Sequence, residues 1–236
     1  MSARRFVLGI DTSGKLGSIA LAESGSVLRW EPLPPGGHSS GLSRAGETLL
    51  EEKGITWSDV AGVAVASGPG SFTGLRIGLA WAKGFCLGSG ATLLLVSSHE
   101  AAAHQHREDG GLIGTVLQGE RGQVEAALWS GGEAATRLWG PESVPEGDLP
   151  SALIAASAAA RRTDSSIGVA GAVLRPELVE ILRRQGFRLL EAGVRPPGAA
   201  AVAELGDRML VAGEKLDLCT AAPVYGRSPN ARKPAS

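Results

Sequence analysis

The sequence predicts an α/β protein built from a duplicated unit. The first half of the chain has three strand-like segments followed by a helix, a strand and a second helix, and the second half repeats this order after a connecting strand and helix. A strand meander followed by alternating helix and strand is typical of a mixed sheet covered by helices. The 236 residues, of which 43% are hydrophobic, suffice for one large domain or two small ones with a substantial core.

In the first half, apolar runs separated by glycine-bearing turns predict the strands. A helix is expected to begin with a cap at Ser39 or Ser40 and to end at Gly54, with its apolar positions on one face. The other predicted elements of this half are strands over 6–10, 18–23, 27–31 and 62–66 and a helix over 75–87.

The second half repeats the pattern and defines the expected domains. Its predicted strands cover 92–96, 112–117, 123–129, 134–139, 166–170 and 187–190, and its predicted helices cover 98–107, 151–161, 176–185 and 199–212. We expect one domain over 1–100, a second over 101–227, and a polar, proline-bearing flexible tail over 228–236.

Composition and charge exclude several classes of protein. The formal net charge of −1 provides no global basic field for a polyanion, so nucleic acid would need a local patch or a partner's surface. Cys86 and Cys219 lie beside apolar residues and are predicted to be buried thiols, which suits a reducing compartment. Neither a signal peptide nor a membrane-length apolar stretch is found, so we expect a cytoplasmic protein without a membrane partner.

The segment 67–78, Ser-Gly-Pro-Gly-Ser-Phe-Thr-Gly-Leu-Arg-Ile-Gly, organises the first half. Ser71 or Thr73 can cap the helix that follows. Gly78 and Gly84 lower the helix propensity, so another surface is expected to approach the backbone there. A glycine-rich turn before a helix suits either an anion cradle or close packing. The spacing matches neither a P-loop nor a dinucleotide fingerprint, which favours packing.

The order of elements fits the duplicated ribonuclease-H-like architecture of actin, sugar kinases and Hsp70 ATPases, known as the ASKHA fold. Several motifs also resemble the TsaB (YeaZ) family. The resemblance is strong over 6–103, weaker from Leu112 onward, and returns near Pro223. The motifs that carry it are Gly9-Ile10-Asp11-Thr12-Ser13, His38, the block 68–78, Ala82-Lys83-Gly84 and a predicted strand at Pro223-Val224-Tyr225.

The resemblance implies a supporting subunit that is not an enzyme on its own. In this family TsaB dimerises with its catalytic paralogue TsaD, which forms threonylcarbamoyladenosine beside the tRNA anticodon, and the small ATPase TsaE joins them. It implies no intrinsic cofactor, although ATP could bind in the assembled complex, and only indirect contact with tRNA. A surface built for a paralogue can also accept a copy of itself, so a homodimer is expected in isolation.

The resemblance also implies where the partner binds. In the family, the helices that flank the central block form the dimer face. The interface residues expected from this are His38, Pro69, Gly70, Ser71, Phe72, Thr73, Leu75, Arg76, Gly78, Leu79 and Ala82.

Asp11 is the candidate acid. In ATPases of this fold a carboxylate at this position orients a metal–nucleotide, so Asp11, Thr12 and Ser13 would form a vestigial phosphate turn. The alternative is an Asx-type turn that satisfies local backbone donors. Gln118 stands where the second half should supply a matching carboxylate, which favours the structural turn. A nucleotide hydrolase of the actin-like fold that uses Asp11 is the alternative function.

No catalytic residue or metal site is expected. The catalytic paralogue's His-x-x-x-His ligands fall on Ser98 and Ala102, which speaks against the metallopeptidase activity once suggested for relatives (peptidase M22-like). His99, His104 and His106 lack ligand spacing and are predicted to be exposed helix residues.

Two basic pairs in the second half, Arg161-Arg162 and Arg183-Arg184, are predicted to be solvated helix faces. Ser71 has no His or Asp partner suggested by spacing, so it is not expected to be a nucleophile.

Overall fold

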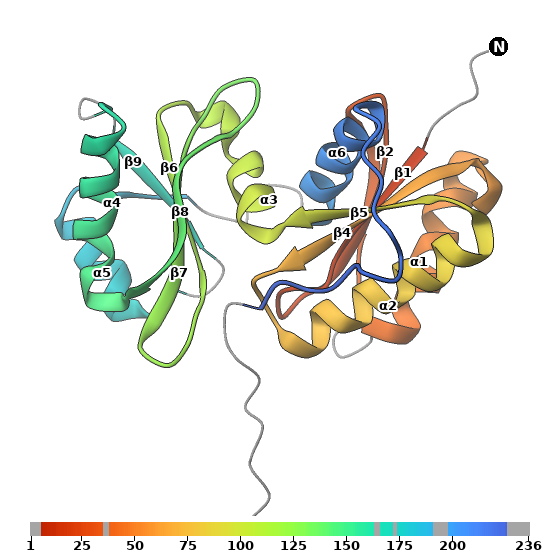
Figure 1. Ribbon diagram of the computed structural model, residues 1–236, viewed down its shortest axis with the longest axis horizontal. Coiled ribbons are helices and arrows are strands. Elements are labelled where there is room, and N and C mark those ends of the chain that lie inside the picture. The colour runs from red at the N-terminus through yellow and green to blue at the C-terminus, as the bar shows by residue number, and fades with distance from the viewer. Residues whose placement is uncertain (1–5, 35–37, 163–165, 172–173, 191–197, 226–236) are drawn as a thin grey trace, which may run out of the picture.

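The computed structural model describes residues 6–34, 38–162, 166–171, 174–190 and 198–225. Two five-stranded sheets lie beside each other, with helices on their faces (Figure 1). None of the helices in these described ranges is long and apolar enough to cross a membrane.

The first sheet has the order β3-β2-β1-β4-β5. The three N-terminal strands form an antiparallel meander, and β4 and β5 extend the sheet in parallel beside β1. Its strands are β1 (Phe6–Asp11), β2 (Ser18–Glu23), β3 (Ser26–Pro32), β4 (Val60–Gly68) and β5 (Thr92–Ser97).

The second sheet repeats this arrangement. Its order β10-β9-β6-β7-β8, read in reverse, is equivalent to the first, with β6 in the place of β1. Its strands are β6 (Leu112–Gln118), β7 (Gln123–Ser130), β8 (Thr136–Pro145), β9 (Ile167–Gly171) and β10 (Arg188–Leu190). The predicted duplication and mixed sheets are therefore present.

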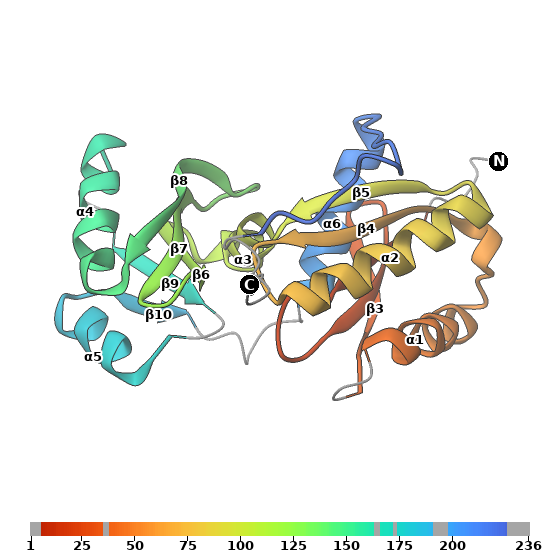
Figure 2. The ribbon, with the colours of Figure 1, turned by 60° about the horizontal axis from the view of Figure 1, so that its bottom comes forward.

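The helices cover the sheets unequally. In the first half, α1 and α2 cover one face of the sheet and α6 covers the other (Figure 2). In the second half, α4 and α5 cover the outer face, and α3 lies between the two sheets (Figure 1). The helices are α1 (His38–Lys53), α2 (Phe72–Ser89), α3 (Ser98–Gln105), α4 (Leu149–Ala159), α5 (Pro176–Arg184) and α6 (Gly198–Val211), and single 3-10 turns lie at Trp57–Asp59, Arg107–Asp109 and Glu146–Asp148.

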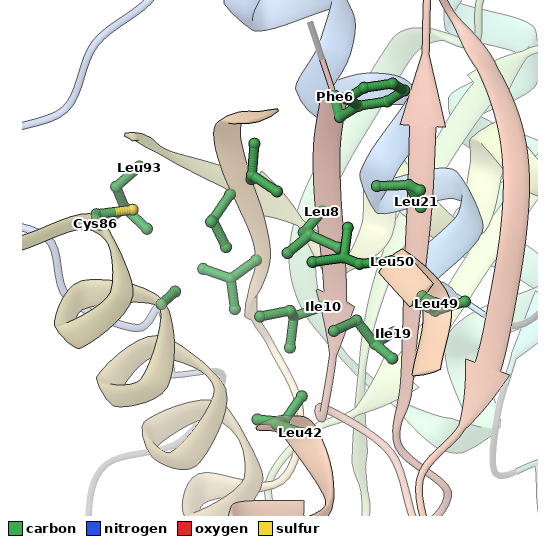
Figure 3. Close-up of a cluster of buried hydrophobic side chains, with 14 of the residues drawn as sticks. Phe6, Leu8, Ile10, Ile19, Leu21, Leu42, Leu49, Leu50, Cys86 and Leu93 are labelled. Carbon is green, nitrogen blue, oxygen red and sulfur yellow. The ribbon is translucent and has the colours of Figure 1, made fainter. Parts of the chain in front are cut away.

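Strand alternation explains why the first sheet buries both faces. Phe6, Leu8 and Ile10 point toward α1 and α2, where they meet leucines of α1 such as Leu49 (Figure 3). Val7 points to the opposite face and packs with alanines and Val202 of α6. The apolar run of β1 therefore serves two layers, as expected for a strand in the middle of a covered sheet.

The position of α6 differs from our expectation. We placed residues 199–212 in the second domain, but α6 packs on the first sheet, although the exact domain boundaries stay a prediction. Gly9 and the small side chains of α6 permit this close approach, since an added Cβ at Gly9 would lie 2.6 Å from Ala203 Cβ.

Two smaller predictions were wrong and a third is untested. Cys219 is exposed in a turn after α6, where its N–H donates to Asp217, whereas Cys86 is buried as predicted. The segment Pro223–Tyr225 is not a strand, although Val224 N donates to Ser67 O at 2.7 Å. The predicted tail over 228–236 lies outside the described residues.

Candidate functional site

The turn after β1 satisfies its own polar groups. Asp11 Oδ1 accepts hydrogen bonds from Ser13 N at 2.9 Å and from Ser13 Oγ at 2.6 Å, which is the Asx-turn geometry. Thr12 is fully buried, and its hydroxyl donates to Gly74 O at 2.7 Å. The turn is thus bonded both within itself and to the start of α2.

Glycines in the central block let this turn pack against α2. An added Cβ would lie 2.7 Å from Ser13 Cβ at Gly70, would collide with Thr12 O at Gly74, and would collide with Thr12 Oγ1 at Gly78. The surface that we expected to approach Gly78 is therefore the turn after β1. Gly84 differs, because no heavy atom of the described chain lies within 4 Å of its added Cβ.

The Asp11 carboxylate also meets the start of α6. A side chain at Gly198 would collide with Asp11 Oδ2, so the carboxylate lies against the N-terminus of this helix, where the helix dipole favours a negative charge. In the structure Asp11 is thus bonded to Ser13 and packed against the N-terminus of α6, and its role toward a phosphate stays a prediction. Gln118, at the equivalent end of β6, is exposed.

The orientation of α2 divides the predicted interface residues into two groups. Leu75, Gly78, Leu79 and Ala82 lie on the buried side of the helix, and Pro69 is also buried, while their role in an interface stays a prediction. Because α2 is apolar on most of its circumference, the sequence does not show which side of the helix faces the sheet.

The remaining predicted interface residues lie nearer the surface. Phe72, Thr73 and Arg76 are exposed, and Gly70 and the helix cap Ser71 are half-buried. His38 begins α1, and its side chain is outside the described part of the structure. Their role in an interface stays a prediction.

Sequence reasoning missed an aromatic groove between α1 and α2. It has a volume of about 530 Å³, and Trp81 Nε1 donates to Ser43 Oγ at 2.9 Å across it. Trp81 and Phe85 stack with an interplanar angle of 4°, and the ring centres of Trp57 and Phe85 lie 5.3 Å apart. The groove is lined by Ser43, Glu47, Trp57, Ala80, Trp81, Gly84 and Phe85. Two tryptophans and one phenylalanine thus share this surface groove.

A second aromatic cluster marks the N-terminal end of α2. Arg76 Cζ lies 3.8 Å from the centre of the Phe72 ring, and Arg76 Nε donates to Tyr225 Oη at 2.9 Å. The Phe72 and Tyr225 rings lie 4.8 Å apart. The hydrogen bond of Val224 to β4 brings Tyr225 to this position from far along the chain.

The histidines are buried, so the prediction that they are exposed was wrong. His99, His104 and His106 are no more than 3% exposed, because α3 is enclosed between the two sheets. His99 Nδ1 lies 2.8 Å from Thr115 Oγ1, which also accepts from Trp129 Nε1 at 3.0 Å. Burial lowers the pKa of His99 from 6.5 to about 4.

A second histidine joins α3 to α6. His104 Nε2 lies 2.7 Å from Glu204 Oε2, and Arg107 Nη2 lies 3.3 Å from the same oxygen. Burial acts to raise the pKa of Glu204, but the hydrogen bond with His104 and the charge of Arg107 outweigh it and hold this pKa below its usual value. Among the described residues, no group of three or more His, Cys, Asp and Glu side chains could hold a metal ion.

Comparison with known sequences relates the chain to tRNA-modification proteins. A family model described as "TsaD: tRNA N6-adenosine threonylcarbamoyltransferase" matches residues 36–136. The tRNA threonylcarbamoyladenosine biosynthesis protein TsaB of Bacillus subtilis is 34% identical over 124 residues, which cover 52% of this chain and 54% of that protein. TsaB of Escherichia coli is 31% identical over 150 residues, which cover 59% of this chain and 64% of that protein. The match therefore spans less than two thirds of each of these curated relatives.

Comparison with solved structures extends the likeness of the fold to most of the chain. YeaZ from Pseudomonas aeruginosa has a TM-score of 0.75 and 22% identity, with 94% of this chain and 99% of that chain covered. Component A of (R)-2-hydroxyglutaryl-CoA dehydratase from Acidaminococcus fermentans has a TM-score of 0.52 and 11% identity, with 87% of this chain and 99% of that chain covered. The predicted fold class is confirmed. The chain is similar in sequence to the TsaB proteins over part of its length, and it shares with YeaZ a duplicated ribonuclease-H-like, ASKHA-like fold.

Proposed function

We propose that this chain is a non-catalytic subunit in the biosynthesis of threonylcarbamoyladenosine in tRNA, and that it pairs with a TsaD-like catalytic protein. The names of the TsaB relatives support this pathway. A tRNA N6-adenosine threonylcarbamoyltransferase of Lawsonia intracellularis is also 37% identical over 103 residues, although these cover only 29% of that protein. The chain thus shares a segment with the catalytic class that it would bind.

The observation that carries the proposal is the exposed face formed by α1 and α2. Trp81 and Phe85 form an aromatic wall, while Gly84 leaves its backbone open to close approach. Leu87, one turn further along α2, is 79% exposed. A groove of aromatic side chains beside a bare helix backbone can receive a helix from another protein, with burial of apolar surface as the driving force.

The environment of Asp11 supports a structural role rather than catalysis. Its carboxylate is bonded to Ser13 and packed against Gly198, and its turn is closed against α2. We therefore assign no intrinsic cofactor. ATP and a TsaE-like ATPase would bind only in the assembled complex, and tRNA would be contacted through that complex. We place this complex in the cytoplasm. Without its partner, the chain would self-associate through the same face.

A pull-down with matched variants tests the pairing. The tagged chain is co-expressed with the TsaD-like protein of its own organism, and complexes are measured by size-exclusion chromatography with light scattering. Gly84→Arg should abolish the heterodimer and leave the circular dichroism unchanged, because this position is open. Gly147→Arg, at an open position of the second half, is the control and should co-purify normally. Normal pairing of Gly84→Arg would contradict the proposed face.

Leu79 and Gly78, both among the predicted interface residues, are unsuitable positions for this test. Leu79 is buried, and a side chain at Gly78 would collide with Thr12 Oγ1, so substitution at either position would damage the fold as well as the interface.

Calorimetry separates the proposal from the hydrolase alternative. We expect no binding when Mg-ATP is titrated into the isolated chain. Tight binding that is lost in Asp11→Ala would instead favour the actin-like hydrolase. Turnover of ATP by the purified chain alone would contradict the assignment of a non-catalytic subunit.

A further inference from the structure

The cluster of Phe72, Arg76 and Tyr225, hereafter the Arg76 cluster, holds a cation in a defined position at the surface. The guanidinium stacks on Phe72 at 3.8 Å, and its Nε is bonded to the Tyr225 hydroxyl at 2.9 Å. Tyr225 is itself held in place because Val224 N donates to Ser67 O at 2.7 Å. Segments 149 residues apart thus converge to orient one exposed arginine.

The cluster retains unused binding capacity. Nε is bonded to tyrosine, and no carboxylate of the described residues forms an ion pair with Arg76. The two terminal nitrogens of a guanidinium form a planar fork that matches a carboxylate. A fork that two aromatic rings already orient loses less conformational entropy when it binds.

The surroundings favour an anionic ligand. The cluster lies at the N-terminal end of α2, the positive end of the helix dipole, and the cap Ser71 is neutral, with no acidic residue in the first turn. Asp11, on the neighbouring turn, is bonded to Ser13 and packed against Gly198. No negative charge on α2 therefore competes for Arg76.

We propose that the Arg76 cluster binds a carboxylate side chain of the protein partner, which deepens the proposed function and rests on it. Phe72, on which the cation stacks, is 38% exposed, and Val224, next to Tyr225 in the chain, is 59% exposed, so the cluster combines an arginine with exposed apolar side chains as a protein–protein hot spot does. Nucleic acid would require several phosphate contacts, whereas this cluster has one cation.

Position also connects the cluster to the groove. Phe72, Arg76, Ala80 and Gly84 are all exposed and follow one another at intervals of four along α2, so they form one continuous stripe of the helix. A partner helix in the groove at Gly84 would extend along this stripe to Arg76. The apolar groove would then supply most of the buried area, and Arg76 would select the partner by its charge.

Titration calorimetry with the full-length chain and the purified TsaD-like protein tests the proposal. Arg76→Gln should weaken the complex by about 30-fold or more, since an oriented arginine at an interface is typical of a hot spot. Tyr225→Phe removes only the hydroxyl that orients Arg76 and should weaken binding by about three- to tenfold. Arg184→Gln, on an exposed helix of the second half, is the matched control and should change affinity by less than about twofold. Thermal unfolding of each variant verifies that the fold is intact.

The outcomes distinguish this inference from the proposed function. If the native chain binds the partner, Gly84→Arg does not, and Arg76→Gln binds as tightly as the native chain, the α1–α2 face stands and the carboxylate site is wrong. If the native chain does not bind the TsaD-like protein at all, both are wrong. If Arg76→Gln keeps its affinity for the partner but the complex loses affinity for tRNA, the cluster is an RNA contact and this proposal is overturned.

Discussion

The two halves share one strand order, but their outer helices present different surfaces. In the second half, α5 buries Leu178 and Leu182, and apart from Ile181 its exposed side carries charged residues such as Glu180 and Arg184. In the first half, the exposed side of α2 carries apolar side chains and bare glycine backbone, and its polar residues are Thr73, Arg76 and Ser89. A solvated helix face is normally polar, so the comparison favours α2 over α5 as the proposed contact helix.

The turns at the ends of the central strands differ in the same way. After β1, the turn at Asp11 is closed by α2 on one side and by α6 on the other. After β6, residues Gln118, Glu120 and Arg121 of the hairpin are exposed. The equivalent position of one fold is thus a packing junction in the first half and a surface loop in the second.

The largest expected effect tests that junction. Gly74→Ala should lower the free energy of unfolding by about 4 kcal/mol or more, because its Cβ would collide with Thr12 O. Gly84→Ala, on the same helix but at an open position, should raise it by about 0.5–1 kcal/mol through helix propensity. Urea unfolding followed by circular dichroism measures both. Equal changes in the free energy of unfolding for Gly74→Ala and Gly84→Ala would show that the turn after β1 does not pack closely against α2.

Two buried threonines compare the halves directly. Thr115→Val should lower the free energy of unfolding by about 3 kcal/mol, because His99 Nδ1 and Trp129 Nε1 would both lose their buried partner. Thr12→Val should cost about 1–2 kcal/mol, since only the carbonyl of Gly74 loses a donor. The same unfolding measurements apply. A larger loss of unfolding free energy in Thr12→Val than in Thr115→Val would contradict this ranking of the two threonines.

Acid sensitivity should arise at α3, between the two halves. The pKa of His99 is about 6.5 in the unfolded chain and about 4 in the folded one, so the unfolded chain binds more protons between these values. The contribution of neutral His99 to the stability of the fold is therefore fully present above pH 6.5, and it is lost as the pH falls toward 4. Between pH 7 and pH 5 the loss from this residue should be about 2 kcal/mol. Stability curves at these two pH values should be closer together in His99→Asn.

A measurement at lower pH would add a second group. The depressed pKa of Glu204 contributes stability above its unfolded value, and this contribution is lost as the pH falls through the folded value. Restricting the comparison to pH 5 and above reduces the contribution of Glu204, and burial also raises the pKa of Glu100, so the difference between the native chain and His99→Asn is what isolates His99. An unchanged pH dependence in His99→Asn would rule out this histidine as its source.

The smallest expected effect is at the exposed face of α5. Arg184 pairs with Glu180 at 2.9 Å, but both side chains are more than half exposed. Arg184→Ala should change the free energy of unfolding by less than about 0.5 kcal/mol, because water and salt screen such pairs. Thermal unfolding at low and high salt measures this change. A loss above 1 kcal/mol would mean that this face also carries a contact that matters.

Local pattern was enough to predict most elements and part of the site. The strands of both meanders, the cap at Ser71 and the Asx-turn at Asp11 depend on neighbouring residues, so they can be read from short segments. The aromatic groove could have been found by asking which apolar side chains remain once the core side of α2 is chosen. Trp81 and Phe85 belong to that remainder, and Trp57 of the preceding 3-10 turn joins them in the groove.

The sequence by itself determined the duplicated order of strands and helices and the need for glycine where the turn meets α2, because periodicity and backbone freedom are local properties. Only the tertiary structure decided which side of α2 is buried, that α6 returns to the first sheet, and that the histidines of α3 are enclosed. These outcomes depend on contacts between residues far apart in the chain. A helix that is apolar on most sides, or made largely of alanine, carries no local signal of which surface it will meet.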